Sequence, residues 1–347
     1  AGEGLRPGTA RDPGGAVAPQ ITVSFNEALA AAVAALKAAG AAPEHAAATG
    51  RALVAAEAEG NRGVGLKHLF AYAAALREGR IAGAAEPVVE EVTEAVTRVD
   101  AAEGFPHLGF ERALPRLAEG AVRLGLAMLT LANGYPCGAL GTFARRLAEE
   151  HGLAALVAAN AGPAVMPASG GTAKVFCTNP IAFAVPRGAE AAALVIDQSS
   201  SSASLATLRE YAEAGREIPE GWALDPAGHP TTDARAALAG ALLPFGGARG
   251  ANIALMVELL AAGLTGANWS KDAPPFNKGS KSPGAGLFIL AIAPPAGFDA
   301  RLQDWIAMLQ TDGAHLHGLA KGEALDHARH RGFAVDAELW AKVKELA

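Results

Sequence analysis

Short apolar runs alternate along this chain with longer segments that have helical periodicity, and this alternation limits the folds available to it. The clearest runs, suited to buried strands, are 125–131, 153–159, 181–185, 193–197 and 286–292. Helical patterns cover 24–42, 43–59, 66–78, 111–124, 138–151, 205–214, 248–264, 298–310 and 337–346. Because no regular strand–helix–strand period appears, the sequence predicts an α/β or α+β fold with a mixed sheet.

The composition excludes several classes of protein. The chain has 347 residues, of which 51% are hydrophobic, so it can bury a large core. A net charge of −6 argues against nucleic acid and anionic membranes as partners, and no uninterrupted apolar run is long enough for a transmembrane helix. The two cysteines, Cys137 and Cys177, make no disulfide framework and favour a reducing, cytoplasmic location. Residues 1–20 are rich in Gly and Pro and predict a disordered arm. Nowhere in the sequence do His and Cys residues have the spacing of metal ligands.

A glycine-rich loop opens the predicted helix at 248–264. Gly246 and Gly247 allow close approach of backbone to a ligand, and the helix N-terminus offers free N–H groups. Arg249 adds a guanidinium fork suited to phosphate. The alternative is a tight turn followed by a surface arginine. The common dinucleotide and phosphate fingerprints, GxGxxG after a first strand and GxxxxGK[ST], are missing.

Two further segments place polar residues at the end of a predicted strand or within a predicted turn. Asp197 closes the run at 193–197, where a carboxylate can accept hydrogen bonds from ribose hydroxyls or can cap a loop. Thr178-Asn179-Pro180 is an Asn-Pro turn, which by itself is a common structural feature. Neither segment decides between a ligand site and a structural role.

Three segments of the chain carry a family resemblance: Cys177-Thr178-Asn179-Pro180, Ile218-Pro219-Glu220-Gly221-Trp222-Ala223 and Pro244-Phe245-Gly246-Gly247-Ala248-Arg249-Gly250. Taken together, they resemble the type-2 malate/L-lactate dehydrogenase family. They are most similar to its branch that reduces cyclic ketimino acids such as Δ1-piperideine-2-carboxylate and Δ1-pyrroline-2-carboxylate. The resemblance implies a non-Rossmann fold with a largely antiparallel sheet and flanking helices. It also implies a homodimer, with a helical domain (21–100 plus 295–347) and a cofactor-binding domain (101–294).

The resemblance further implies NADPH or NADH as cofactor. The positions that match cofactor contacts of the family are Asn160, Ala161, Thr178, Asn179, Asp197, Gln198, Ser199, Gly247 and Arg249. The family usually has lysine where Arg249 stands, so a bidentate fork replaces a point charge here.

The chain departs from the family where the family keeps its histidines. Its Ser-His-Gly-x-x-Arg-Leu pattern corresponds to residues 63–69, where Gly63, Val64 and His68 replace serine, histidine and arginine. The second histidine, in His-x-Gly, corresponds to Pro136. A C-terminal arginine is also lost, in the segment that contains His315.

These losses change the chemistry that the resemblance implies. Valine and proline cannot move a proton, and a keto acid that becomes an alkoxide needs an acid at its oxygen. An iminium substrate is already electrophilic and needs little such help. His68 and Lys67 are therefore the candidate catalytic residues, as replacement cations for a substrate carboxylate, with His315 as a second carboxylate contact. The alternative is that they are ordinary surface residues.

The sequence thus predicts an NAD(P)H-dependent oxidoreductase that reduces an imine or iminium of the ketimino acid type, with a small carboxylate as substrate. Two other hypotheses remain open at this point. One is a non-redox enzyme on the same scaffold, for cyclisation, condensation or elimination. The other is a non-catalytic homologue that acts as a binding or partner subunit.

Overall fold

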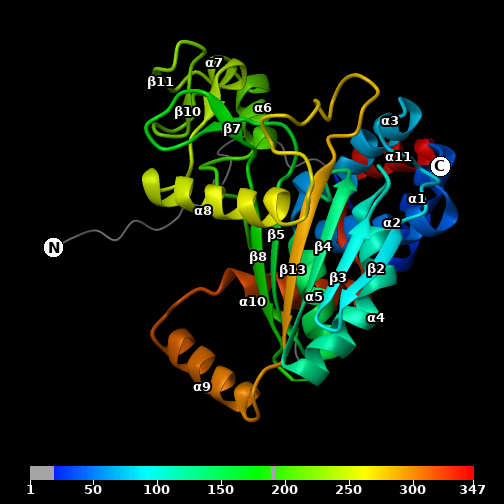
Figure 1. Cartoon of the computed structure of the whole chain (residues 1–347). Helices are drawn as coiled ribbons and strands as arrows, with labels where there is room; N and C mark the ends of the chain where they lie inside the picture. The colour runs from blue at the N-terminus through cyan, green and yellow to red at the C-terminus, as the bar shows by residue number, and fades with distance from the viewer. Residues whose placement is uncertain (1–18, 189–191) are drawn as a thin grey trace.

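The fold is built around one seven-stranded sheet, described here from a computed structural model that covers residues 19–188 and 192–347 (Figure 1). Its strands are β2 (Val88–Thr93), β3 (Val96–Asp100), β4 (Leu126–Gly134), β5 (Ala154–Ala159), β8 (Ile181–Val185), β9 (Leu194–Gln198) and β13 (Ala285–Ile292). They lie in the order β2-β3-β4-β13-β5-β8-β9, and among these neighbours β3 and β4 alone are parallel. The predicted mixed, largely antiparallel sheet without Rossmann topology is confirmed.

One face of this sheet is covered by α4 (Pro106–Leu124) and α5 (Gly141–His151). Side chains alternate along each strand, so every second residue packs under these helices, as Ala182 and Ala184 do in β8. The intervening Phe183 points to the other face. Most of the main hydrophobic core lies between the sheet and the two helices.

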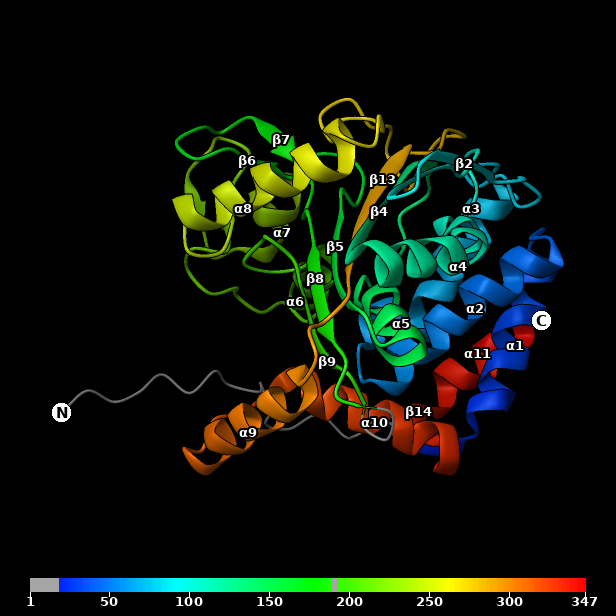
Figure 2. The same ribbon diagram turned by 60° about the horizontal axis from the view of Figure 1, so that its bottom comes forward.

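A helical layer joins the two ends of the described chain (Figure 2). β1 (Gln20–Val23) pairs antiparallel with β14 (Phe333–Asp336), beside α1 (Phe25–Ala38), α2 (Pro43–Ala58), α3 (Leu69–Arg77) and α11 (Ala337–Leu346). Ser24 caps α1, because its side chain accepts a hydrogen bond from the Glu27 N–H at 3.2 Å. Two 3₁₀ turns, Arg62–Val64 and Leu66–His68, lead into α3.

A smaller lobe holds those segments between β5 and β13 that lie outside the central sheet. It contains β6 (Met166–Pro167), β7 (Lys174–Phe176), β10 (Ala223–Leu224), β11 (Pro230–Thr231), β12 (Ala241–Leu242), α6 (Leu205–Glu213), α7 (Ala234–Ala239) and α8 (Ala248–Glu258). A π-helical turn, Leu259–Gly263, extends α8. The lobe has its own core around Met166, Leu208 and Ile218.

Several local predictions were wrong at their ends. The helix expected at 66–78 begins at Leu69, after the 3₁₀ turn, and the helix expected at 111–124 begins five residues earlier, at Pro106. The sequence did not predict α10 (His317–Arg331), which follows α9 (Phe298–Thr311) and packs on β9.

The predicted division into domains stays a prediction, but the structure shows where two of the predicted domain boundaries fall. Residues 88–100, assigned to the helical domain, form the β2–β3 hairpin at the edge of the central sheet. Residues 1–18 of the expected disordered arm lie outside the described residues, whereas Gln20 is paired with Asp336 in a strand.

Candidate active site

Three of the segments singled out in the sequence are joined by hydrogen bonds around Ser200. Its N–H donates to the Thr178 carbonyl at 2.8 Å, and its hydroxyl donates to the Asn179 carbonyl at 2.7 Å. The Phe245 N–H donates in turn to the Ser200 carbonyl at 3.0 Å. The turn at 178–180, the loop after β9 and the start of α8 therefore form one surface.

The start of α8 has the properties of a phosphate site. Gly246 and Gly247 have φ of 59° and 64°, a left-handed conformation that favours glycine, and open space surrounds both. Arg249 is exposed and makes no ion pair with the residues that the structure describes. Free N–H groups at a helix N-terminus beside an unpaired guanidinium suit an anionic ligand, so these residues fit a dinucleotide phosphate.

Asn179 has a structural role as well as a place in this surface. Its side chain is fully buried, and its amide N–H groups donate to the Ala254 carbonyl and to Glu258 Oε2, both at 2.8 Å. Glu258 also accepts from the Ser270 N–H at 2.6 Å. The Asn179 amide nitrogen therefore anchors α8, and its backbone φ of 37° sets the turn. Neighbouring Thr178 is only half-buried.

Asp197 faces the start of α5. Its Oδ2 accepts a hydrogen bond from the Gly141 N–H at 2.7 Å, and burial raises the pKa of this carboxyl above its usual value. The Asp197 side chain therefore satisfies a free N–H group at the N-terminus of α5. Gln198 is exposed and Ser199 half-buried, so these two are the more accessible members of the predicted cofactor set.

The two positions where the family keeps its histidines, Val64 and Pro136 in this chain, lie near each other. A Cβ added to Gly138 would come within 3.8 Å of the Val64 carbonyl oxygen, and Pro136 is two residues before Gly138. The Tyr72 hydroxyl donates to the Pro136 carbonyl at 2.8 Å, and His107 Nε2 lies 3.1 Å from the Cys137 carbonyl. Buried side chains therefore fix the 136–138 loop beside Val64.

His68 and Lys67 differ in the charge that they can supply. Burial lowers the pKa of His68 to about 4, so its imidazole is neutral near pH 7, and it packs edge-on against Tyr72 at 4.5 Å. The expectation of a cationic His68 therefore disagrees with its surroundings in the free protein. Lys67 has a side chain that is 64% exposed, and it lies 3.8 Å from Glu210 of α6.

Asn160 and Ala161 line a cavity of about 10 Å³, roughly the space of one water molecule, together with Tyr135, Pro136 and Cys137. The Asn160 amide donates to the Asn268 carbonyl, and its oxygen accepts from the Gly286 N–H, both at 2.6 Å. Asn160 therefore fixes the chain on either side of the 272–284 loop.

That loop is held over the 136–138 segment through Phe276. The Tyr135 hydroxyl donates to the Phe276 carbonyl at 2.7 Å, and the buried Arg80 guanidinium also donates to it. Sequence reasoning did not identify Tyr72, Arg80, His107 or Tyr135, because each acts through a backbone carbonyl far away in the chain and no local pattern marks such a role.

The remaining predicted residues can also be placed. His315 is exposed and stands just before α10, whose Gly318 packs so closely on β9 that an added Cβ would overlap the Val195 carbonyl oxygen. Burial raises the pKa of the Cys177 thiol to about 11, which makes it a poor nucleophile. Within residues 19–188 and 192–347, no group of three His, Cys, Asp or Glu side chains is arranged to hold a metal ion.

This geometry can be compared with known proteins. A sequence profile described as malate/L-lactate dehydrogenase matches residues 23–344. The chain belongs to the malate/L-lactate dehydrogenase family. The predicted family is thus confirmed.

Named relatives in this family are oxidoreductases. The (2R)-3-sulfolactate dehydrogenase (NADP(+)) of Chromohalobacter salexigens is 42% identical over 306 residues, 85% of this chain and 89% of the relative. The Δ1-pyrroline-2-carboxylate reductase of Ancylobacter novellus is 37% identical over 320 residues, 90% of this chain and 93% of the relative. Neither name supports a non-redox enzyme or a non-catalytic subunit.

A solved structure in the malate/L-lactate dehydrogenase family has the same fold. The crystal structure of Δ1-piperideine-2-carboxylate reductase from Pseudomonas syringae pv. tomato superimposes with a TM-score of 0.88 at 31% identity. The match covers 94% of this chain and 100% of that one. The ketimine-reducing branch suggested by the sequence motifs therefore contains a close structural neighbour.

Proposed function

We propose that this malate/L-lactate dehydrogenase family member is an NAD(P)H-dependent reductase of a cyclic imine or iminium that carries a carboxylate. The observation that supports this most is the pairing of Val64 with the 136–138 loop. Neither Val64 nor Pro136 can donate a proton, yet the segments that surround the cofactor site in the family remain joined. An iminium already carries the positive charge that a general acid would otherwise create.

The residues of the candidate site would have the following roles in cofactor binding and catalysis. Gly247 and Arg249 at the start of α8 would hold the cofactor phosphate, with Gln198, Ser199, Thr178 and Ala161 along the same surface. When bound there, the cofactor would supply the hydride that an iminium carbon accepts, with the C=N π electrons becoming the nitrogen lone pair. Phe276 and its loop would exclude water from the 136–138 segment.

Recognition of the substrate carboxylate requires a cation. Lys67 is charged, exposed and close to the Val64 turn, and its contact with Glu210 at 3.8 Å is loose enough to be exchanged. His68, neutral in the free protein, would supply a packing surface or a hydrogen bond, and His315 remains a candidate second contact. Release of Lys67 from Glu210 would then accompany substrate binding.

The 42% identity to a sulfolactate dehydrogenase favours one other substrate class, a 2-oxo acid. Its reduction needs a proton at the developing alkoxide, a step worth on the order of 10²–10⁴ in rate. The hydroxyl of Tyr72, which like Val64 lies beside Gly138, already donates to the Pro136 carbonyl. The imine reaction therefore suits these residues better.

We also propose that the protein is a homodimer. The sheet face opposite α4 and α5 exposes neighbouring Phe183 (37%) and Ile196 (50%). Trp305 of α9 and Leu259 next to α8 are also about half exposed, and Figure 1 shows these helices at opposite ends of that face. An apolar surface of this kind is typical of protein interfaces.

We assign the protein to the cytoplasm, where both cysteines, which are unpaired, would stay reduced. Among the described residues no helix is long and apolar enough to cross a membrane.

The test begins with cofactor binding. Purified protein is titrated with NADPH and NADH while quenching of tryptophan fluorescence is followed, and micromolar binding of either is expected. Oxidation of the bound cofactor is then measured at 340 nm with Δ1-piperideine-2-carboxylate, Δ1-pyrroline-2-carboxylate, pyruvate and 3-sulfopyruvate. Turnover of the cyclic imines above the 2-oxo acids is expected. No cofactor binding up to millimolar concentration, or faster reduction of a 2-oxo acid, would overturn the proposal.

A further inference from the structure

A second cavity lies away from the 136–138 loop, between α2, α4, α5 and α10, and has a volume of about 220 Å³. A cavity of about 150 Å³ lined by apolar side chains is enough to bind benzene. The space here therefore accommodates a six-membered ring and a polar group of two or three atoms. Nothing in the proposed reductase reaction uses it.

The wall of this cavity is mixed, because the buried Arg145–Glu59 ion pair lines it beside apolar side chains. Phe110 and Phe143, both almost fully buried, meet edge to face at 5.0 Å, and Leu325 of α10 is fully buried. The space exists because α2 presents only small side chains to it, namely Ala48, Ala52 and Ala55. Burial lowers the pKa of His107, which also lines the cavity, to about 3, so the ring is neutral. The lining side chains that are both apolar and partly exposed are Phe25, Leu29, Ala52 and Ala55, and these can receive an apolar ligand body.

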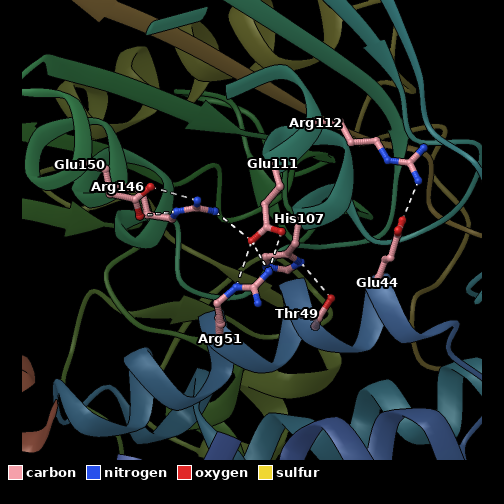
Figure 3. A network of polar contacts seen from close by, with 8 residues as sticks. All are labelled: Glu44, Thr49, Arg51, His107, Glu111, Arg112, Arg146 and Glu150. Atoms are coloured by element: carbon pink, nitrogen blue, oxygen red, sulfur yellow. Dashed lines mark hydrogen bonds and ion pairs between the residues drawn. The ribbon is translucent and has the colours of Figure 1, made fainter. Parts of the chain in front are cut away.

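The rim of the cavity is charged. Arg51 of α2 and Arg146 of α5 converge on Glu111 of α4, as Figure 3 shows. Arg51 donates to the two Glu111 oxygens at 2.6 and 2.8 Å through Nη2, and Arg146 donates to Glu111 at 2.9 Å. The Arg146 side chain also pairs with Glu150 at 2.7 Å. Glu111 is therefore shared between two guanidinium groups.

Some guanidinium N–H groups at the rim remain available. Arg51 hydrogen-bonds through Nε and Nη2, so Nη1 makes no hydrogen bond with any described residue. Arg329 of α10 uses only Nη1, at 3.3 Å from both Glu149 and Asp326, which leaves its Nε and Nη2 without partners in the described chain. Both side chains are nearly half exposed. Guanidinium forks with unused donors are suited to carboxylates.

We propose that this cavity binds a small monocarboxylate with an apolar ring or short chain. The apolar body lies against the partly exposed Phe25, Leu29 and Ala52, and the carboxylate accepts hydrogen bonds from Arg51 and Arg329 at the rim. This site is separate from the reductase site, and its existence does not depend on the reaction proposed above.

The cavity is also linked to the candidate active site. His107 lies in its wall and is hydrogen-bonded to the Cys137 carbonyl, and the Thr142 hydroxyl donates to the Ala139 carbonyl at 2.8 Å. A ligand in the cavity therefore contacts side chains that hold the 136–140 segment.

The proposal is tested with benzoate as the probe and benzyl alcohol as its neutral counterpart. Binding to the full-length protein is measured by calorimetry and by saturation-transfer NMR. For a ligand of this size we expect a Kd for benzoate on the order of 1 mM, and about ten-fold weaker binding of benzyl alcohol. Equal binding of the two compounds, or no saturable benzoate binding, would overturn the proposal.

Two variants assign the binding to this cavity. Ala52→Leu fills the space and is expected to abolish benzoate binding, whereas Ala30→Leu, at an exposed position of α1, leaves it unchanged. Arg329→Gln is expected to weaken benzoate about ten-fold without affecting benzyl alcohol, and Arg123→Gln, an exposed arginine of α4, serves as its control. Circular dichroism verifies that each variant is folded. Wild-type affinity in folded Ala52→Leu would place benzoate elsewhere and refute the assignment.

Discussion

Replacement of Gly65 by alanine should destabilise the protein, because the turn that carries Val64 packs directly on a buried carboxylate. Glu57 of α2 accepts a hydrogen bond from the Leu66 N–H at 2.8 Å. A Cβ on Gly65 would overlap Glu57 Oε2 and would lie only 2.9 Å from Glu57 Cα. Since that Cα belongs to the helix backbone, the turn must move away or the carboxylate must leave its position.

The size of the effect follows from two terms. Loss of the hydrogen bond leaves a buried polar group unsatisfied and costs about 1–3 kcal/mol, and overpacking of a well-filled site costs about 1–3 kcal/mol. The reduced entropy of the unfolded chain offsets up to about 1 kcal/mol of this. We therefore expect Gly65→Ala to lower the free energy of unfolding by about 3 kcal/mol.

Gly63→Ala is the matched control. Gly63 lies in the same turn, but no atom comes within 4 Å of its added Cβ. This variant should change the free energy of unfolding by less than about 1 kcal/mol. Urea unfolding followed by tryptophan fluorescence measures both variants. Equal stability of Gly65→Ala and Gly63→Ala would show that Glu57 does not fix this turn and would refute the reasoning.

Three further predictions concern pH, cofactor and assembly. The pKa of His107 is about 3 in the folded protein and about 6.5 when unfolded, so its neutral form contributes stability above pH 6.5 that is lost as pH falls. In urea titrations, His107→Gln should therefore reduce the difference in unfolding free energy between pH 7 and pH 5 by about 2 kcal/mol. An unchanged difference would contradict this. Arg249→Gln should raise the Kd of NADPH about ten-fold by fluorescence titration, whereas Arg235→Gln, an exposed arginine of α7, should leave it unchanged. Ile196→Lys should shift the dimer to monomer in light scattering behind size-exclusion chromatography, and a stable dimer in this variant would place the interface on another face.

Much of the fold could be predicted from the sequence, because buried strands are defined by short local runs. The run at 181–185 is β8, and the run at 286–292 differs from β13 by one residue. In contrast, α10 was missed because Gly318 and Gly322 lower its helix propensity and no apolar stripe marks it. Both glycines are required by the fold, since α10 approaches β9 so closely that an added Cβ would meet the 192–195 segment.

The sequence by itself determined the family and the mixed sheet, and it predicted the segments around the candidate cofactor site, because these depend on residue types at fixed local spacing. Only the tertiary structure showed that Val64 lies beside the loop after Pro136, since this contact joins residues far apart in the chain. It also decided the ionisation of His68, because burial rather than residue type sets the pKa. The role of Asp197 was likewise decided by the tertiary structure. A carboxyl group that ends a strand can contact a ligand or a helix N-terminus, and because β9 packs against α5, Asp197 contacts the helix.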